Sequence, residues 1–276
     1  MLQCEGEAPA GSQKGLRPTL AAGNYFLACQ AHPTSTIRIQ NAEGPKPVDC
    51  VVRTSEVVGE GVARLTLQLA AAMEYKPGQY LDVIHPDGTR RSYSIASLPE
   101  DGVIEMHVRR VDGGKHSSWL HGLVPGDQLQ VRGPFGQCFH MADDDQRKLL
   151  LIGAGTGLAP LIGIARDALG QGHQGQVILL HGGLQPNRLY LRDRLSELEQ
   201  EWPNFDVHHC VLQDATEEET QGDLDKVAIE VAGDLGRARA FLCGDDTIVQ
   251  KLQRSLFLAG MPSREILADP FSPQLS

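Results

Sequence analysis

Residues 149–169 read LLLIGAGTGLAPLIGIARDAL, which is the pattern of a strand, a tight turn and a helix. The first four residues are apolar, as in a strand of a parallel sheet covered on both faces. Three glycines follow in the turn: Gly153, Gly155 and Gly157. Pro160 suits the first turn of a helix, where its missing N–H has no cost. Because the first N–H groups of a helix lack partners within it, this junction predicts a site for a pyrophosphate.

The glycine spacing departs from the full dinucleotide-binding pattern G-x-G-x-x-G, because Leu158 stands where the third glycine would fall. A glycine-rich turn without a ligand is therefore an alternative interpretation. A membrane span is a second alternative, since residues 149–165 carry no charge. We expect no span, because glycines and Pro160 interrupt a stretch that is barely long enough to cross a bilayer.

Composition limits the class of protein. At 276 residues and 41% hydrophobic content, the chain is long enough for two ordinary globular domains. Its net charge of −10 opposes binding to nucleic acid. No basic and apolar leader follows Met1, so we expect a cytoplasmic protein. The six cysteines are scattered singly, which indicates reduced thiols rather than a disulfide framework.

Alternating patterns before residue 145 predict antiparallel strands. Around residues 63–69, 81–83, 104–109 and 129–131, apolar and polar residues alternate with the two-residue period of a half-buried strand. Short turns such as Pro86-Asp87-Gly88 separate these segments. This half of the chain is therefore predicted to form an antiparallel barrel or sandwich.

From Leu149 the pattern changes to alternating strands and helices. Strands are expected over 177–181, 205–212 and 238–243, with helices over 189–200 and from Asp245 or Asp246 to 259. Such alternation predicts a doubly wound parallel sheet whose ligand crevice lies at the carboxyl ends of the strands. The glycine turn lies at that edge.

Basic residues gather in the barrel half of this acidic chain, close to Gly113-Gly114 and two serines. They are Arg90, Arg91, Arg109, Arg110 and Lys115. Arginine offers two-pronged hydrogen bonds to phosphate, so the cluster predicts a second phosphate ligand. Solvated charges on strands are the alternative.

Four motifs in fixed order carry a resemblance to a known family. They are Arg91-Ser92-Tyr93-Ser94, Gly114-Lys115-His116-Ser117, Gly155-Thr156-Gly157-Leu158-Ala159-Pro160, and Cys243-Gly244. Between about Pro47 and Phe271 the chain resembles the ferredoxin-NADP reductase family. The resemblance implies an FAD-binding β-barrel over 47–145 and an NAD(P)-binding α/β domain over 146–276.

The resemblance also implies roles for individual residues. Arg91 would bind the flavin phosphate, Tyr93 would stack on the isoalloxazine, and Ser94 would sit beside flavin N5. Cys243 would lie close to the nicotinamide, and Phe271 near the C-terminus would cover the flavin. The implied catalytic residues are Ser94, Tyr93, Cys243 and Phe271. The implied cofactor-binding residues are Arg91, Ser92, Tyr93, Ser94, His107, Arg109, Gly114, Lys115, His116, Ser117, Gly155, Thr156, Gly157, Leu158, Pro160, Cys243, Gly244 and Asp245.

Two departures from the family pattern concern the nicotinamide cofactor. Asp245 and Asp246 replace a common Pro-Pro after Cys243-Gly244 and bring negative charge close to it. Gly182-Gly183-Leu184 replaces a common Gly-Ala-Arg, so the arginine that could meet a 2′-phosphate is absent. This favours NADH over NADPH, although Arg188 stands close enough to compensate and no acidic residue ends this strand to hold a ribose diol.

The segment 1–46 resembles the back half of a plant-type 2Fe-2S ferredoxin. Glu5-Gly6-Glu7, Leu20-Ala21-Ala22-Gly23 and Phe26-Leu27-Ala28-Cys29-Gln30 carry this likeness, with Cys29 matching the last cluster ligand. The other ligands would fall before Met1, so we expect a truncated ferredoxin-like segment and no cluster in this chain as it stands. No metal site is expected elsewhere, because His208, His209 and Cys210 alternate between the faces of a strand.

The predicted function is that of an FAD-dependent NAD(P)H reductase that passes electrons to a one-electron acceptor. The acceptor would be a redox partner protein, either a ferredoxin or an oxygenase component. One alternative is a free-standing NADPH-dependent ferredoxin or flavodoxin reductase. Another is a non-catalytic nucleotide-binding or electron-chain docking module. The residues leave the oligomeric state and the choice between FAD and FMN open.

Overall fold

The computed structural model describes residues 2–14, 21, 23–39 and 45–271. The chain divides into two compact units between Lys46 and Pro47. The first unit contains a small sheet in which β1 (Leu2–Glu5) pairs with β2 (Tyr25–Phe26) and β3 (Arg38–Ile39), and a short 3-10 turn, η1 (Ala28–Gln30).

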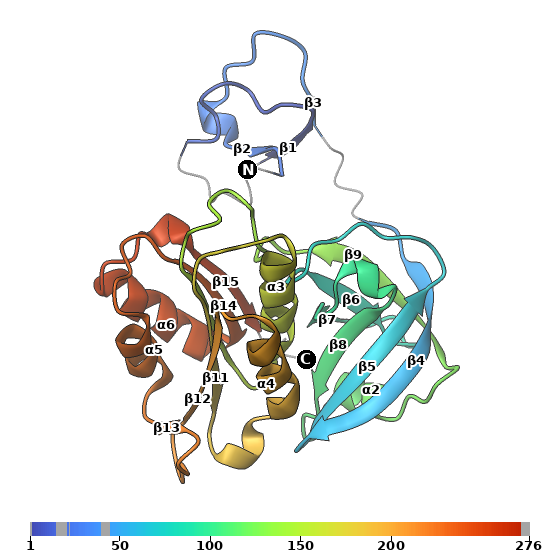
Figure 1. The fold of residues 1–276 in the computed structure, drawn as a ribbon. Helices are drawn as coiled ribbons and strands as arrows, with labels where there is room; N and C mark the ends of the chain where they lie inside the picture. Colours follow the sequence, from blue (N-terminus) through green and yellow to red (C-terminus); the bar gives the residue numbers. More distant parts are fainter. Residues whose placement is uncertain (1, 15–20, 22, 40–44, 272–276) are drawn as a thin grey trace. The chain divides into compact units, whose positions relative to one another are not determined.

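The second unit begins with a six-stranded antiparallel sheet that curls into a barrel (Figure 1). Its strands pair in the order β7-β6-β9-β4-β5-β8. They are β4 (Val48–Gly59), β5 (Val62–Leu69), β6 (Tyr80–Ile84), β7 (Arg90–Ser94), β8 (Ile104–Arg109) and β9 (Gln128–Phe135), with the short helix α2 (Lys115–His121) before β9. The apolar residues of the alternating segments fill the barrel core, which confirms the antiparallel prediction.

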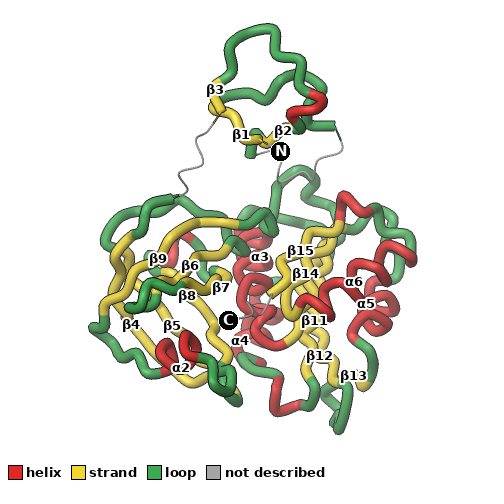
Figure 2. Tube along the Cα trace, turned by 180° about the vertical axis from the view of Figure 1, so that it is seen from behind, coloured by secondary structure: helices red, strands yellow, loops and turns green. Residues whose placement is uncertain are grey.

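The remainder of the second unit is a parallel sheet with the strand order β13-β12-β11-β10-β14-β15. The strands are β10 (Leu149–Ala154), β11 (Val177–Gly183), β12 (Phe205–Val211), β13 (Thr220–Gln221), β14 (Arg239–Asp245) and β15 (Ile266–Phe271). The helices are α3 (Leu158–Gly170), α4 (Arg192–Glu201), α5 (Leu224–Ala232) and α6 (Asp246–Leu258). Helices α3 and α4 lie on the face towards the barrel, and α5 and α6 cover the other face (Figure 2).

The apolar run that begins the decisive stretch is buried on both faces of this sheet. Leu149 and Leu151 pack in the cluster under α3 and α4, whereas Leu150 and Ile152 pack under α5 and α6. At about 25 cal/mol per Å² of apolar surface removed from water, full burial of each such side chain contributes roughly 1.5–3 kcal/mol. A fully apolar run is therefore what a central strand requires here.

Of two predicted helix starts, that of α6 is confirmed and that of α4 is wrong. Asp245 is the N-cap of α6, and its side chain accepts a hydrogen bond from the Thr247 amide at 2.9 Å, which confirms the expected start. The helix predicted over 189–200 instead begins at Arg192. Leu189 and Tyr190 are buried ahead of it, and Leu191 adopts a left-handed conformation with φ 57° that turns the chain into the helix.

Candidate active site

At Gly157 the glycine turn packs so tightly against the neighbouring strand that a side chain would not fit. A Cβ atom built on Gly157 would lie 2.2 Å from the carbonyl oxygen of Cys243. Gly244, with φ 139°, approaches the backbone of Ala154, and Gly155 has φ 54°. Glycine is needed at these positions because other residues meet a steric barrier. The end of β10 and the end of β14 therefore meet backbone against backbone at the carboxyl edge of the sheet.

An arginine from the barrel reaches this turn. Arg109 ends β8, and its Nη1 atom lies 3.4 Å from the position that a Cβ on Gly155 would occupy. A guanidinium beside a glycine turn supplies charge to a phosphate that approaches the exposed backbone. This contact brings together Arg109 and Gly155, two residues from different domains that the sequence places in the site.

The strand β7 presents the flavin motif on two faces. Arg91 and Tyr93 are two residues apart, so they share a face, and both are half-buried. Burial raises the pKa of Tyr93 to about 12, so its phenol stays protonated. Ser92 lies on the opposite face, where its hydroxyl donates a 2.8 Å hydrogen bond to Asp82. The side chain of Ser92 therefore points away from those of Arg91 and Tyr93 and bonds to Asp82 instead.

Ser94 meets an aspartate that the sequence did not single out. Its hydroxyl donates to Oδ2 of Asp269 at 3.3 Å, which joins the barrel to β15 of the dinucleotide domain. Burial raises the pKa of Asp269 to about 6, and the hydrogen bond from Ser94 opposes that rise. Asp269 is the register partner of Cys243 on the neighbouring strand β14. In the sequence, the signal that could have identified Asp269 is its position two residues before Phe271.

Cys243 and Phe271 belong to one apolar cluster. Cys243 is fully buried, and burial together with the neighbouring Cys138 raises the pKa of its thiol well above the usual value. Phe271 packs against the same cluster from the end of β15. The thiol is therefore neutral, and the sequence-predicted pair lies together at the carboxyl ends of β14 and β15.

The turn before α2 is closed by its own serine. The hydroxyl of Ser117 accepts from the Val111 amide at 3.1 Å and donates to the Gly114 carbonyl at 3.2 Å. Lys115, predicted to meet a phosphate, forms an ion pair with Asp87 of the β6–β7 turn, and this contact lowers the pKa of the aspartate. His116 is buried with its ring 5.0 Å from that of His85.

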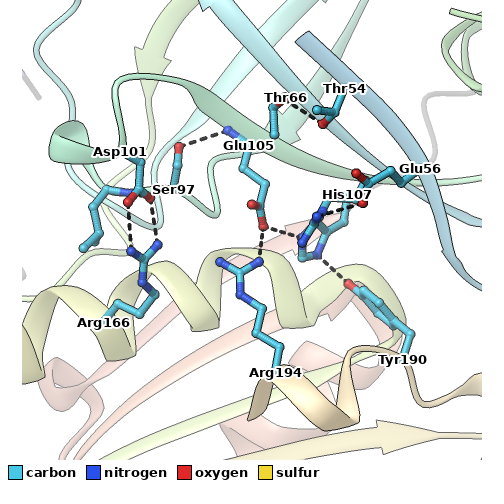
Figure 3. Close-up of polar contacts among 12 residues, drawn as sticks. Thr54, Glu56, Thr66, Ser97, Asp101, Glu105, His107, Arg166, Tyr190 and Arg194 are labelled. Atoms are coloured by element: carbon cyan, nitrogen blue, oxygen red, sulfur yellow. Dashed lines mark hydrogen bonds and ion pairs between the residues drawn. The ribbon is translucent and has the colours of Figure 1, made fainter. Parts of the chain in front are cut away.

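The other predicted cofactor residues occupy three different environments. Leu158 and Pro160 are buried at the start of α3, whereas Thr156 is half-buried in the turn before it. Asp245 is exposed, and it uses its carboxylate to cap α6. The side chain of His107 is buried between the domains, with hydrogen bonds to Glu105 and Tyr190 (Figure 3).

The loops after β11 and β12 meet at the same edge of the sheet. The Gln213 amide donates to the Leu184 carbonyl at 3.0 Å, and Gln185 donates through its side chain to Asp214 at 2.6 Å. Leu184 and Leu212 are exposed beside this pair. Arg188, which stood close enough in sequence to hold a phosphate, forms a 3.1 Å ion pair with Glu60 of the barrel.

The first unit holds the two cysteines of the ferredoxin-like segment in different environments. Cys4 is buried in β1, and Cys29 is exposed in the 3-10 turn η1. Within the described residues, no three His, Cys, Asp or Glu side chains gather as a metal site. Leu20 and Ala22 of the motif lie outside the described residues. In the same ranges, no helix has the length and apolar character needed to cross a bilayer.

Comparisons with known proteins agree with this division of the site. The oxidoreductase FAD-binding domain family matches residues 49–140, and the oxidoreductase NAD-binding domain family matches residues 151–254. The reductase subunit of an aromatic O-demethylase from Amycolatopsis is 34% identical over 267 residues, which span 91% of this chain and 79% of that protein. The ferredoxin–NAD(P)⁺ reductase component of the naphthalene 1,2-dioxygenase/salicylate 5-hydroxylase systems of Ralstonia is 32% identical over 93% of this chain and 81% of that protein.

Solved structures give the same result. The Amycolatopsis cytochrome P450 reductase GcoB superposes with a TM-score of 0.80 at 29% identity, covering 99% of this chain and 86% of that chain. The ferredoxin reductase of carbazole 1,9a-dioxygenase superposes with a TM-score of 0.75 at 25% identity, covering 98% and 85% of the two chains. The barrel and the parallel sheet thus occur in the same combination in both.

Proposed function

Because the chain belongs to the ferredoxin-NADP reductase family and is an FAD-dependent NAD(P)H oxidoreductase, we propose that it carries electrons from NADH to a redox partner protein of an oxygenase system. The contact between Ser94 and Asp269 is the observation that carries this proposal. It joins the flavin motif of the barrel to the strand beside Cys243, next to the glycine turn. A site for hydride transfer requires such contact between the two domains.

The residues of this site fit both cofactors. Arg91 and Tyr93 share one face of β7 for the flavin, and Arg109 lies beside Gly155 of the glycine turn, where its charge would meet a phosphate of the dinucleotide. Arg91 and Tyr93 would hold FAD, which would supply hydride acceptance from a nicotinamide and release of electrons one at a time. Tyr93 and Phe271 then limit access to the site, and Ser94 orients its hydroxyl at the reacting edge. Arg109 holds a phosphate beside the glycine turn.

The domain limits of this proposal are 1–46, 47–145 and 146–276. The compact unit that begins at Pro47 and the two family matches support them. The segment 1–46 is proposed to be ferredoxin-like, and the absence of a 2Fe-2S cluster in it stays a prediction. In this arrangement the electron acceptor is a separate ferredoxin or the oxygenase component itself.

An absorption spectrum tests the proposal most directly. The purified 276-residue chain, supplied with FAD, should show flavin bands that NADH bleaches without oxygen. Reoxidation by a one-electron acceptor such as ferricyanide should restore them. A flavin that neither NADH nor NADPH bleaches would instead support a non-catalytic nucleotide-binding module. Iron–sulfur absorption bands together with an iron analysis of two irons per flavin, both abolished by Cys29→Ser, would overturn the prediction that the first segment holds no cluster.

We predict that Asp214→Asn weakens discrimination against NADPH. Asp214 follows β12, and Gln185 of the neighbouring loop holds its carboxylate at 2.6 Å. The exposed Leu184 and Leu212 flank it and offer apolar surface to an adenine ring. A 2′-phosphate placed here meets a like charge, whereas a ribose diol meets a hydrogen-bond acceptor. The ratio of kcat/KM for NADH to that for NADPH should fall about tenfold in the variant, a change of ~1.4 kcal/mol.

Asp234→Asn is the matched control for charge. Asp234 accepts a hydrogen bond from the Gly236 amide in the loop before β14, at the opposite edge of the sheet. Its substitution makes the same change in net charge and should leave the cofactor ratio unchanged. Equal ratios in wild type and Asp214→Asn would remove Asp214 from the adenosine site and leave the NADPH-dependent alternative open.

Asp269 is expected to make flavin reduction depend on pH. Its pKa of about 6 lies well above the usual value, so the carboxyl gains a proton as the pH falls through this range. The protonated acid donates to Ser94 Oγ and leaves the serine hydroxyl proton for the flavin, whereas the carboxylate competes for that proton. We expect the rate constant for flavin reduction to fall as pH rises through about 6. Asp269→Asn should flatten this profile, because its amide donates at every pH.

Ser94→Ala supplies the companion measurement. Without the hydroxyl, reduction should be slow at every pH, by about a hundredfold, as when one donor is removed from a reacting centre. The inflection near pH 6 should vanish with it. A wild-type inflection that survives in both variants would assign the titration to another group.

A further inference from the structure

The outer face of strand β8 carries three polar residues that face the dinucleotide domain. Glu105, His107 and Arg109 alternate with Ile104, Met106 and Val108, which lie in the barrel core. Residues two apart share a face of a strand, so the three polar side chains point the same way. Glu105 and His107 are 8% and 4% exposed, because the second domain covers them.

A continuous chain of hydrogen bonds crosses between the domains on this face (Figure 3). Arg194 of α4 donates to Glu105 at 2.6 Å, and Glu105 bonds to Nε2 of His107 at 3.0 Å. Nδ1 of His107 bonds to the Tyr190 hydroxyl at 2.8 Å. The two ends of the chain belong to the dinucleotide domain and the two middle members to the barrel.

Charge fixes the direction of each of these bonds. Burial opposes ionisation of Glu105, but the hydrogen bond from His107 and the Arg194 charge outweigh it and lower the pKa to about 2. Burial lowers the pKa of His107 and raises that of Tyr190 well above its usual range. The neutral imidazole therefore donates from Nε2 to the carboxylate and accepts at Nδ1 from the tyrosine hydroxyl.

Packing contacts also hold Tyr190, in addition to the hydrogen bond of its hydroxyl. A Cβ on Gly59 of the barrel would lie 2.6 Å from Tyr190 Cβ, so the tyrosine rests directly on that backbone. Its ring meets those of His107 and His181 edge to face, with centroids 5.4 Å and 5.5 Å away. His181 is the register partner of Gly153, where the glycine turn leaves the sheet. The tyrosine thus links the barrel to the strand beside that turn.

We propose that Tyr190, through its hydrogen bond to His107, is a positioning residue that sets the glycine turn at the correct distance from the flavin-binding barrel. This inference rests on the proposed function, because the distance matters for transfer between the two bound rings. Arg109, the third residue on this face of β8, lies beside the turn at Gly155. His107 accordingly acts through Tyr190 rather than by touching a cofactor with its side chain.

Tyr190→Phe in the FAD-loaded full chain removes one hydroxyl and keeps the ring. A small displacement of reacting groups costs up to about a hundredfold in rate, so we expect flavin reduction at saturating NADH to slow by about ten- to a hundredfold. The Kd for NADH should change by less than about twofold, since a lost transition-state geometry lowers kcat rather than ground-state binding. The long-wavelength absorbance of nicotinamide stacked on flavin should weaken in parallel.

Substitutions of His107 separate the hydrogen bond from packing. In His107→Asn the amide oxygen takes the place of Nδ1 and still accepts from Tyr190, whereas His107→Gln places its amide near Nε2 and serves Glu105. The asparagine variant should therefore reduce its flavin faster than the glutamine variant. The reverse order would overturn the role of the His107–Tyr190 bond.

Arg166→Met is the matched control at the same interface. Arg166 of α3 holds Asp101 of the barrel with two hydrogen bonds of 2.7 Å and 2.8 Å. Its loss should lower Tm without changing the rate constant or the long-wavelength absorbance. If Arg166→Met slowed flavin reduction as much as Tyr190→Phe, the proposal would be overturned, because the whole interface between the domains would then position the glycine turn.

A crystal structure of Tyr190→Phe provides a readout that does not depend on turnover. The glycine turn should shift relative to β8 by about 0.5–1 Å. A variant that superposes on wild type and reduces its flavin at the wild-type rate would overturn the proposal, even if its Tm fell. A wild-type enzyme whose flavin no nicotinamide cofactor reduces would reject the proposed function instead, and the crystal structure would still decide the positioning role.

Discussion

Gly157→Ala is expected to destabilise the dinucleotide domain and to weaken NADH binding. The new Cβ would lie 2.2 Å from the Cys243 carbonyl oxygen and 3.0 Å from the Gly244 Cα atom. Both are backbone atoms at the end of a central strand, so no side-chain rotation relieves the overlap. Overpacking typically costs about 1–3 kcal/mol, and a backbone collision belongs at the upper end. We expect Tm to fall by roughly 6–12 °C.

The same variant should separate the two cofactors. The barrel core does not depend on Gly157, so FAD should remain bound while the KM for NADH rises by about tenfold or more. Calorimetry and steady-state kinetics on the FAD-loaded protein measure the two effects.

Gly170→Ala is the control for the loss of glycine. It ends α3, and a Cβ there meets no atom within 4 Å. Alanine at an unstrained helix position should leave stability unchanged or raise it slightly. A Gly157→Ala protein with wild-type Tm and KM would show that the turn has room for a side chain. The assignment of this turn as a backbone-lined dinucleotide site would then be wrong.

Arg91→Ala should release the flavin. Arg91 lies half-buried on the same face of β7 as Tyr93 and is proposed to hold the flavin phosphate. A charge-assisted hydrogen bond contributes about 1.5–3 kcal/mol, so FAD affinity should fall by roughly ten- to 150-fold. Fluorescence of FAD released during dialysis measures this directly.

Arg90→Ala is the matched control for this prediction. Arg90 is the preceding residue on β7, and its side chain is exposed on the opposite face. The Arg90→Ala substitution removes an equal charge, and the variant should retain the flavin. If Arg91→Ala keeps full flavin occupancy through dialysis, the phosphate contact must lie elsewhere in the barrel.

The sequence by itself determined the two-domain architecture and the position of the glycine turn. Both depend on local chemistry: a strand buried on two faces needs an unbroken apolar run such as 149–152, and a backbone-lined turn needs glycine at residues such as Gly157. Likewise, the carboxylate of Asp245 made the start of α6 predictable, because capping involves only neighbouring residues.

Only the tertiary structure decided which groups from distant segments complete the site. Ser94 and Asp269 are 175 residues apart, and no local pattern relates them. The alternation along β8 showed that Glu105, His107 and Arg109 share a face, but alternation does not say whether water or another domain covers that face. Leu189 and Tyr190 fit a helical pattern, yet they pack before the helix begins. The physical reason is that burial between domains depends on the partner surface, which a residue's own neighbours in the sequence do not encode.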